Sequence, residues 1–137
     1  MNPSRVTLAE ELTRVECMEL LQYNSFVGRL GFILDGRPMV LPVNYLAEET
    51  HLVFCTAPGT AVSQAVGTPV AFEVDGSRSL HHSGWSVLIQ GIARAVVDPD
   101  EVESLRRGPL KSWAAPGPRL WVRVSIDAIS GRRIPGR

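Results

Sequence analysis

The chain has 137 residues, and 45% of them are hydrophobic, which fits one globular domain with its own core. Fourteen basic residues balance fourteen acidic residues, so the sequence lacks the positive excess of a nucleic-acid-binding surface. It also lacks a basic amphipathic helix for a membrane surface and an apolar run long enough to cross a bilayer. These properties exclude nucleic-acid binders and membrane-spanning proteins.

The expected cellular location follows from the N-terminus and the cysteines. The first residues, MNPSRVTLAEEL, lack the apolar core of a secretory signal. Cys17 and Cys55 show neither metal-ligand nor redox spacing, so we expect them to be reduced, buried thiols. The sequence therefore predicts a cytoplasmic protein.

The first expected element is an amphipathic helix within residues 8–23. Thr13 and Glu16 have the spacing of a capping box, in which each side chain bonds to the backbone amide of the other residue. Thr7 and Glu10 have the same spacing, so two helix starts are possible. The apolar face of this helix consists of Cys17, Leu20 and Leu21, with Met18 beside them.

Alternating apolar and polar residues predict strands in most of the remaining chain. The expected strands cover residues 27–34, 38–45, 51–56, 70–75, 84–97 and 120–126, with a short last strand near 130–134. We expect a short helix at 60–66 and a second one after Asp98, which is a suitable N-cap followed by Pro99.

Three positions predict local features of these strands. The dipeptide Asp35-Gly36 is the signal of a two-residue type I′ hairpin. Pro42 cannot donate a backbone hydrogen bond, so it indicates an edge or a bulge in the middle of its strand. Gly91 suggests a bend or a bulge in the long strand 84–97.

The order of elements predicts a mainly β (α+β) fold. Nearly every strand has one apolar face, and six or seven such strands with short antiparallel connections need a shared interior. A small closed or nearly closed barrel supplies that interior, and a sandwich is the alternative. A doubly wound parallel sheet is excluded because helices do not alternate with the strands.

Catalytic signatures are missing from the sequence. It contains no nucleophile-elbow, P-loop, zinc-protease or dinucleotide-binding motif. His81 and His82 are adjacent and would point apart in an extended loop, so we interpret them as exposed loop residues. Neither cysteine has a histidine near it in sequence, which argues against a catalytic thiol.

The segment FCTAPGTA (Phe54–Ala61) is the best candidate for a site. Thr56 and Thr60 carry hydroxyls that can donate to phosphate oxygens, and Gly59 lets the backbone come close to a ligand. The amides at the start of the following helix are unpaired donors. The same residues also fit a turn in which a threonine hydroxyl caps the helix, so both interpretations stay open.

Five segments in order resemble the pyridoxamine 5′-phosphate oxidase-related flavin-binding proteins: VGRLGFILDGRPMVLPVNY, HLVFCTAPGT, PVAFEVD, GWSVLIQGIA and WVRVSIDAISGRR. The resemblance runs from about Glu16 to Arg133. It implies one domain, residues 1–137, with a helical segment at about 8–23 and a six-stranded antiparallel split β-barrel at about 27–134 with two or three short helices. It also implies a homodimer with two cofactor sites at the interface, for which the outward-facing Ile33 is suited.

The resemblance also implies site residues. The turn would hold the cofactor phosphate, and one strand would lie along the flavin ring or its ribityl chain. A further segment would approach the cofactor, often from the partner subunit, although its tryptophan can equally be a core residue. The implied residues are Thr56, Gly59, Thr60 and Ala61 for the phosphate, Pro42, Val43, Asn44 and Tyr45 for the ring, and Trp85 and Ser86 for the third segment.

The sequence departs from many relatives at Ala61, where they have a lysine. Losing an ammonium group that pairs with phosphate weakens binding of flavin mononucleotide (FMN) by about 1–3 kcal/mol, the usual range for bonds to charged groups. Arg29 or Arg37 on the neighbouring strands would be able to compensate. FMN is the expected cofactor, and the deazaflavin F420, FAD or an empty site are alternatives.

The resemblance implies a flavin-dependent oxidoreductase that acts on an unidentified small organic substrate, with chemistry supplied by the cofactor. Alternatives are a deazaflavin F420-dependent reductase, a non-catalytic flavin- or haem-binding module, and a structural protein with an unused pocket. Pyridoxamine phosphate oxidation in the strict sense needs more basic residues, for which Arg132 and Arg133 are candidates. These two arginines also fit a solvated tail.

Overall fold

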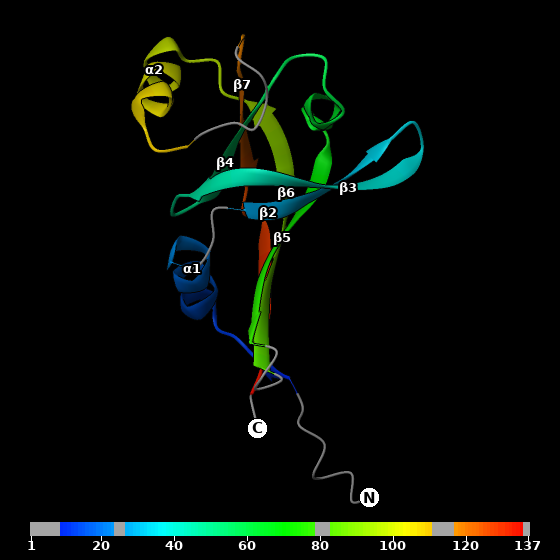
Figure 1. The fold of residues 1–137 in the computed structure, drawn as a ribbon, viewed down its shortest axis with the longest axis vertical. Coiled ribbons are helices and arrows are strands. Elements are labelled where there is room, and N and C mark those ends of the chain that lie inside the picture. Colours follow the sequence, from blue (N-terminus) through cyan, green and yellow to red (C-terminus); the bar gives the residue numbers. More distant parts are fainter. Residues whose placement is uncertain (1–8, 24–26, 79–82, 111–116, 136–137) are drawn as a thin grey trace, which may run out of the picture.

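The structure, a computed structural model, describes residues 9–23, 27–78, 83–110 and 117–135. The strands are β1 (Glu10–Glu11), β2 (Val27–Leu34), β3 (Arg37–Ala47), β4 (His51–Thr56), β5 (Pro69–Arg78), β6 (Ser83–Ala95), β7 (Leu120–Ser125) and β8 (Ala128–Ile134). The helices are α1 (Arg14–Tyr23), the 3-10 helix η2 (Val62–Ala65) and α2 (Pro99–Arg107). Figure 1 shows α1 and α2 on the outside of the strands.

Six antiparallel strands close into a barrel. Pairing runs in the order β6-β5-β2-β3-β4-β7, and β7 pairs back with β6, which completes the ring. Strand β8 lies outside the ring and pairs with residues 84–90 of β6, on the edge opposite β5, and β1 pairs with β8. The predicted split barrel is therefore confirmed, and the sandwich alternative is wrong.

The barrel closes because β6 changes its neighbour at Gly91. Its residues 84–90 pair with β8 and residues 93–95 pair with β7. A Cβ atom at Gly91 would overlap the carbonyl oxygen of Ser125, so only glycine lets the strands cross here. Pairing with β5 continues through Gly91, so the predicted irregularity is a change of neighbour and not a bulge.

Local sequence signals determine where most elements begin. The amide of Thr13 donates to Glu16 Oε1 (3.0 Å), and the Glu16 amide donates to Thr13 Oγ1 (3.2 Å), which is the predicted capping box. The bond from the Thr13 amide keeps the pKa of Glu16 below its usual value. Glu10 of the alternative start lies in β1, and Thr7 lies outside the described residues.

The remaining turn predictions can be checked in the same way. Asp35 and Gly36 have φ angles of 51° and 76°, as a type I′ turn requires. The Asp98 carboxylate accepts from the Glu101 amide (3.2 Å) and caps α2. The helix expected at 60–66 is only one 3-10 turn, and Gly67 follows it with φ of 86°. His81 and His82 lie outside the described residues.

The core fills the barrel and extends to α1. Tyr45 and Phe72 pack edge to face, with ring centroids 5.3 Å apart. The Tyr45 hydroxyl donates to the Leu21 carbonyl (2.8 Å), which fastens α1, and burial raises the pKa of Tyr45 to about 12. A second cluster beneath α2 consists of Val53, Cys55, Val96, Leu110 and Trp121. Both cysteines are buried and free, as predicted.

In the described part of the chain, no helix is long and apolar enough to span a membrane. The same residues contain no cluster of three or more histidines, cysteines or carboxylates that would hold a metal ion.

We expect Gly28→Ala to destabilise the protein by about 1–3 kcal/mol, the range for overpacking a core. The new Cβ would overlap Cε1 of the fully buried Phe72 ring and lie 3.2 Å from the Glu73 carbonyl oxygen. Urea denaturation measures the change in unfolding free energy. Gly31→Ala on the opposite face of β2 is the control, because its Cβ meets nothing closer than 3.6 Å. Equal loss in both variants would contradict the packing argument.

Candidate functional site

The pairing of strand β3 with β4 stops next to the predicted cofactor residues. It pairs with β2 up to Asn44, whereas its pairing with β4 involves only Tyr45–Ala47. Pro42 therefore has one neighbouring strand, as predicted for a residue without an amide hydrogen. The β3–β4 register ends at Phe54, while Thr56 continues to pair with β7. We call this break in pairing, between residues 42–44 and 55–56, the β3–β4 opening.

Hydroxyl groups hold the turn that leaves β4 at this opening. Thr60 Oγ1 donates to the Ala57 carbonyl (2.9 Å) and accepts from the Ser63 amide (3.2 Å). Because the Thr60 hydrogen is used on Ala57, Thr56 is the donor in the 2.8 Å bond between the two threonines. Both hydroxyl hydrogens are engaged inside the turn, and one must rotate outward before it can donate to a ligand.

The turn also presents backbone donors. Among the described residues, the amides of Ala61 and Val62 have no hydrogen-bond partner, whereas those of Ser63 and Gln64 each bond back to the turn at 3.1 Å. Gly59 has a φ of 82° and open space beside it, so the main chain is accessible there. The turn is thus capped by a hydroxyl group, as one interpretation of the sequence held, and it also carries unpaired backbone amides, among them those of Ala61 and Val62.

The predicted ring strand offers mainly its backbone. Val43 and Tyr45 are buried with their side chains in the core, and the Tyr45 hydroxyl already bonds to α1. Pro42 is exposed and Asn44 is half-buried on the other face. Because side chains alternate along a strand, a ligand at the opening would meet main-chain groups of residues 42–45 and the Asn44 side chain.

The structure does not bring Trp85 and Ser86 to the opening of the same chain. They pair with Gly76 and Asp75 near the far end of β5, which Figure 1 places at the opposite end of the molecule from η2. Trp85 packs against the core, and a Cβ at Gly76 would lie 2.7 Å from its Nε1. Ser86 lies on the other face of β6, which is the outside of the barrel.

The two arginines proposed to replace the missing lysine lie on β2 and β3. Arg29 is on the outer face, where its Nη1 lies 3.2 Å from Glu73 and 2.9 Å from Asp75. Arg37 is the first residue of β3, five positions before Pro42 and so about 16 Å away along the strand. Arg29 is therefore already paired with two carboxylates.

The carboxylates of Glu73 and Asp75 both pair with the guanidinium of Arg29, and the pKa of Glu73 is raised. Burial raises the pKa of Glu73 to about 7, and the hydrogen bond to Asp75 and its charge act in the same direction. Arg29 lowers the pKa of Glu73 but does not cancel these effects. The pair therefore holds a proton near neutral pH.

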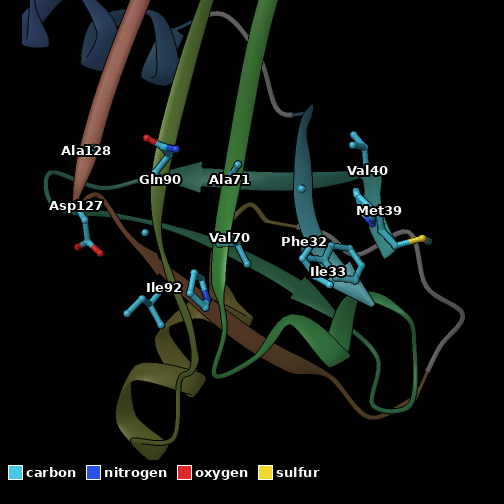
Figure 2. Close-up of a pocket in the computed structure, with 14 residues that line it drawn as sticks. Phe32, Ile33, Met39, Val40, Val70, Ala71, Gln90, Ile92, Asp127 and Ala128 are labelled. Atoms are coloured by element: carbon cyan, nitrogen blue, oxygen red, sulfur yellow. The ribbon is translucent and has the colours of Figure 1, made fainter. Parts of the chain in front are cut away.

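Sequence reasoning missed a groove of about 660 Å³ on the outside of the sheet. Figure 2 shows Val40, Ala71, Gln90 and Ala128 in line across the strands that form it. Gly31 lies between Val40 and Ala71 in the same register. The available signal was a small residue at each of the outward positions 31 and 71, where neighbouring outward residues are large.

Residues 13–133 match the family model described as pyridoxamine 5′-phosphate oxidase. Because this match covers most of the chain, and the barrel agrees with it, the protein belongs to the pyridoxamine 5′-phosphate oxidase family. The resemblance inferred from the five sequence segments is thereby confirmed.

Individual proteins and solved structures are also similar to this chain. An uncharacterized protein from Mycobacterium tuberculosis is 31% identical over 139 residues, covering 97% of this chain and 90% of that protein. The structure of an FAD binding protein from Mycobacterium smegmatis has a TM-score of 0.81 and 32% identity, covering 93% of this chain and 100% of that chain. The structure of an FAD-binding protein from Mesorhizobium loti has a TM-score of 0.74 and 26% identity, covering 92% of this chain and 98% of that chain.

We expect the unfolding free energy to fall as pH rises from about 5 to 8, because of the Glu73–Asp75 pair. The folded pKa of Glu73, about 7, lies above its usual value of 4.5, so the folded state binds the proton more tightly. This stabilisation is complete below pH 4.5 and is lost as pH passes 7. Glu73→Gln should flatten this part of the curve, measured by urea denaturation at several pH values. Glu103→Gln on α2 is the control and should keep the slope.

Proposed function

We propose that the protein is a flavin-binding oxidoreductase whose cofactor sits at the β3–β4 opening. One observation carries this proposal. The pairing of β3 with β4 stops at the point where a turn with unpaired amides and two threonines begins. The two relatives that are FAD-binding proteins, at 32% and 26% identity, support a flavin as the ligand.

The described residues offer hydrogen-bond donors that suit the phosphate of a flavin cofactor. The amides of Ala61 and Val62 and the hydroxyls of Thr56 and Thr60 would hold a phosphate, and Gly59 leaves room for it. Backbone groups of residues 42–45 would face the ring. When bound, a flavin supplies hydride or electron transfer. The chain's own contribution is to hold the cofactor and to keep water away.

The charge of the turn favours FAD over FMN, the cofactor named first from sequence. Residues 56–66 contain no lysine, arginine or histidine. A terminal phosphate monoester carries about −1.5 to −2 charges at pH 7, whereas each phosphate of a diphosphate linkage carries about −1. Neutral donors compensate a dianion poorly. FAD is therefore the cofactor that we propose, and FMN and the deazaflavin F420 are the comparisons.

Strict pyridoxamine phosphate oxidation receives no support from the C-terminal arginines. Arg132 pairs with Ser86 and Arg133 with Trp85, so their side chains leave opposite faces of β8. Arg133 also lies 3.7 Å from Glu16. Two arginines on opposite faces cannot grip one phosphate, so we propose a different small organic substrate. The buried free thiols support a cytoplasmic location.

We propose further that the protein is a homodimer. Ser86, which the resemblance places near the cofactor, faces outward at a distance from the opening of its own chain, so a second copy would have to supply it. Ile33 and Val40 are 58% and 66% exposed, which is unusual for such residues on a sheet face and supports a covering partner.

Thr60→Val should weaken flavin binding by about tenfold or more, since a hydrogen bond to a charged phosphate contributes about 1.5–3 kcal/mol. Quenching of flavin fluorescence during titration gives the affinity. Thr68→Val is the matched control, because it removes a similar hydroxyl bond, to the Ala65 carbonyl (2.7 Å), just beyond η2. If the wild type shows no quenching with FAD, FMN or F420, the proposed function is wrong. Bound flavin without turnover across electron donors would indicate a non-catalytic binder.

Ala61→Lys should tighten binding of FMN by about 5- to 150-fold, which corresponds to 1–3 kcal/mol. Ala61 packs against the core at the start of η2. The aliphatic part of a lysine at this position can therefore lie along apolar surface while its ammonium group reaches the turn. The gain should be larger for FMN than for FAD, because FMN has the greater charge on one phosphate. Calorimetric titration of both flavins tests this, and an equal gain would contradict the charge argument.

A further inference from the structure

A small cavity lies on the outer face of β4, β7 and β6. At this level of the barrel, Leu52, Val124 and Ala93 point into the core. Because side chains alternate along a strand, the residues next to them face outward. Outward residues of the three strands, together with the loop before β4, line a cavity of about 200 Å³. The lining residues are Thr50, His51, Ile92, Arg94, Arg123 and Ser125.

Two arginines lie side by side in this cavity. Arg94 of β6 is the register partner of Arg123 of β7, so both side chains leave neighbouring strands on the same face. Like charges directly opposite each other in a sheet are destabilising. Glu101 of α2 compensates only one of them, since its Oε2 lies 2.8 Å from Arg123 Nη2. In the part of the chain that the structure describes, Arg94 has no ion-pair partner.

Arg123 also has an unsatisfied donor. Its Nε atom is buried and has no hydrogen-bond partner among the described residues. A buried N–H group of a charged side chain is costly when it lacks an acceptor, and such groups are rare in folded proteins. The cavity therefore holds a positive charge that lacks a counter-charge and a donor that lacks an acceptor.

Ser125 adds a neutral donor to the cavity wall. Its Oγ accepts from the Ile92 amide (3.0 Å), which leaves the hydroxyl hydrogen available to donate. His51 is already engaged on its own strand. Its Nδ1 lies 2.9 Å from Thr50 Oγ1, and its Nε2 lies 3.1 Å from Glu48 Oε2 without the alignment of a hydrogen bond. Glu48 is thus placed against the histidine, and the charge of the arginine pair is unchanged.

We propose that this cavity binds a small oxyanion of the phosphate or sulfate class between Arg94 and Arg123. The guanidinium groups supply charge-assisted donors, among them the buried Nε–H of Arg123, and the Ser125 hydroxyl supplies a neutral one. An oxyanion in this position offsets the repulsion between the arginines and gives the orphaned Nε–H its acceptor. A cation or an apolar ligand would do neither.

The oxyanion site is separate from the β3–β4 opening of the same chain. His51 and Thr56 are the first and last residues of β4, five positions apart and so about 16 Å apart along the strand. The turn with the unpaired amides follows Thr56, whereas the arginine pair lies toward the His51 end, next to the pair of Val53 and Arg123. This inference therefore does not rest on the proposed flavin function.

Calorimetric titration of the full chain with inorganic phosphate, at constant ionic strength, tests the site. Arg94→Gln should lower the affinity about tenfold or more, because it removes a charged donor. Arg106→Gln is the matched control, since it removes the same charge from α2, where Arg106 lies 3.8 Å from Glu103. The control should bind phosphate as the wild type does. Equal losses in both variants, or no loss in either, would overturn the site.

Thermal unfolding gives a second readout. Arg94 is exposed, so Arg94→Gln should fold. In chloride buffer it should unfold at the temperature of the wild type or above it, because the repulsion between the arginines is gone. Phosphate should raise the unfolding temperature of the wild type and of Arg106→Gln, but not that of Arg94→Gln. An equal rise in all three proteins would contradict the proposal.

A flavin titration separates this site from the proposed function. Arg94→Gln should bind flavin as tightly as the wild type does. If it loses flavin binding together with phosphate binding, the arginines belong to the cofactor site and the separate oxyanion site is wrong. A wild type that binds phosphate through Arg94 but binds no flavin supports the oxyanion site and contradicts the proposed function.

A second probe distinguishes the sources of the oxyanion. Glycerol 3-phosphate carries the same group on a larger molecule. Binding tighter than that of inorganic phosphate, and dependent on Arg94, indicates a phosphate ester as the natural occupant. Equal or weaker binding indicates the free ion. Absence of binding by both probes overturns the proposal.

Discussion

Main-chain pairing is the constraint on which this structure depends, because every strand of a closed barrel needs a partner on each side. Two strands, β6 and β3, have neighbours over only part of their length. β6 leaves β8 for β7 at Gly91, which closes the ring. β3 pairs with β2 through Asn44 and with β4 only from Tyr45, which leaves the ring locally open. Partial pairing thus closes the ring at β6 and opens it between β3 and β4, where the candidate site lies.

The opening is suited to binding because its donors are held by the fold. The turn keeps its shape through Thr60, which bonds to Ala57 and Ser63 without any ligand. The amides of Ala61 and Val62 have no partner among the described residues, so they can bind an anion without breaking an internal bond. The threonine hydroxyls differ, because each must give up an internal acceptor. Binding at this turn therefore relies first on the backbone and only then on the side chains.

Sequence patterns predicted the features that depend on neighbouring residues. The Thr13–Glu16 capping box, the Asp35-Gly36 turn and the alternation of the strands are local, and the structure contains each of them. The changes of partner could not be predicted, because they depend on which distant strands meet. For the same reason the family resemblance named Ser86 as a site residue but could not show that it lies far from the turn of its own chain.

Glycines separate what the fold requires from what function requires. Gly28 and Gly91 are required, since a Cβ would overlap Phe72 in the first case and Ser125 in the second. Gly31 meets no such obstacle, and alanine at this position would be favoured over glycine within a strand. Gly31 and Ala71 are the small residues in the middle of the outer groove, so they keep that groove open without being required by the barrel.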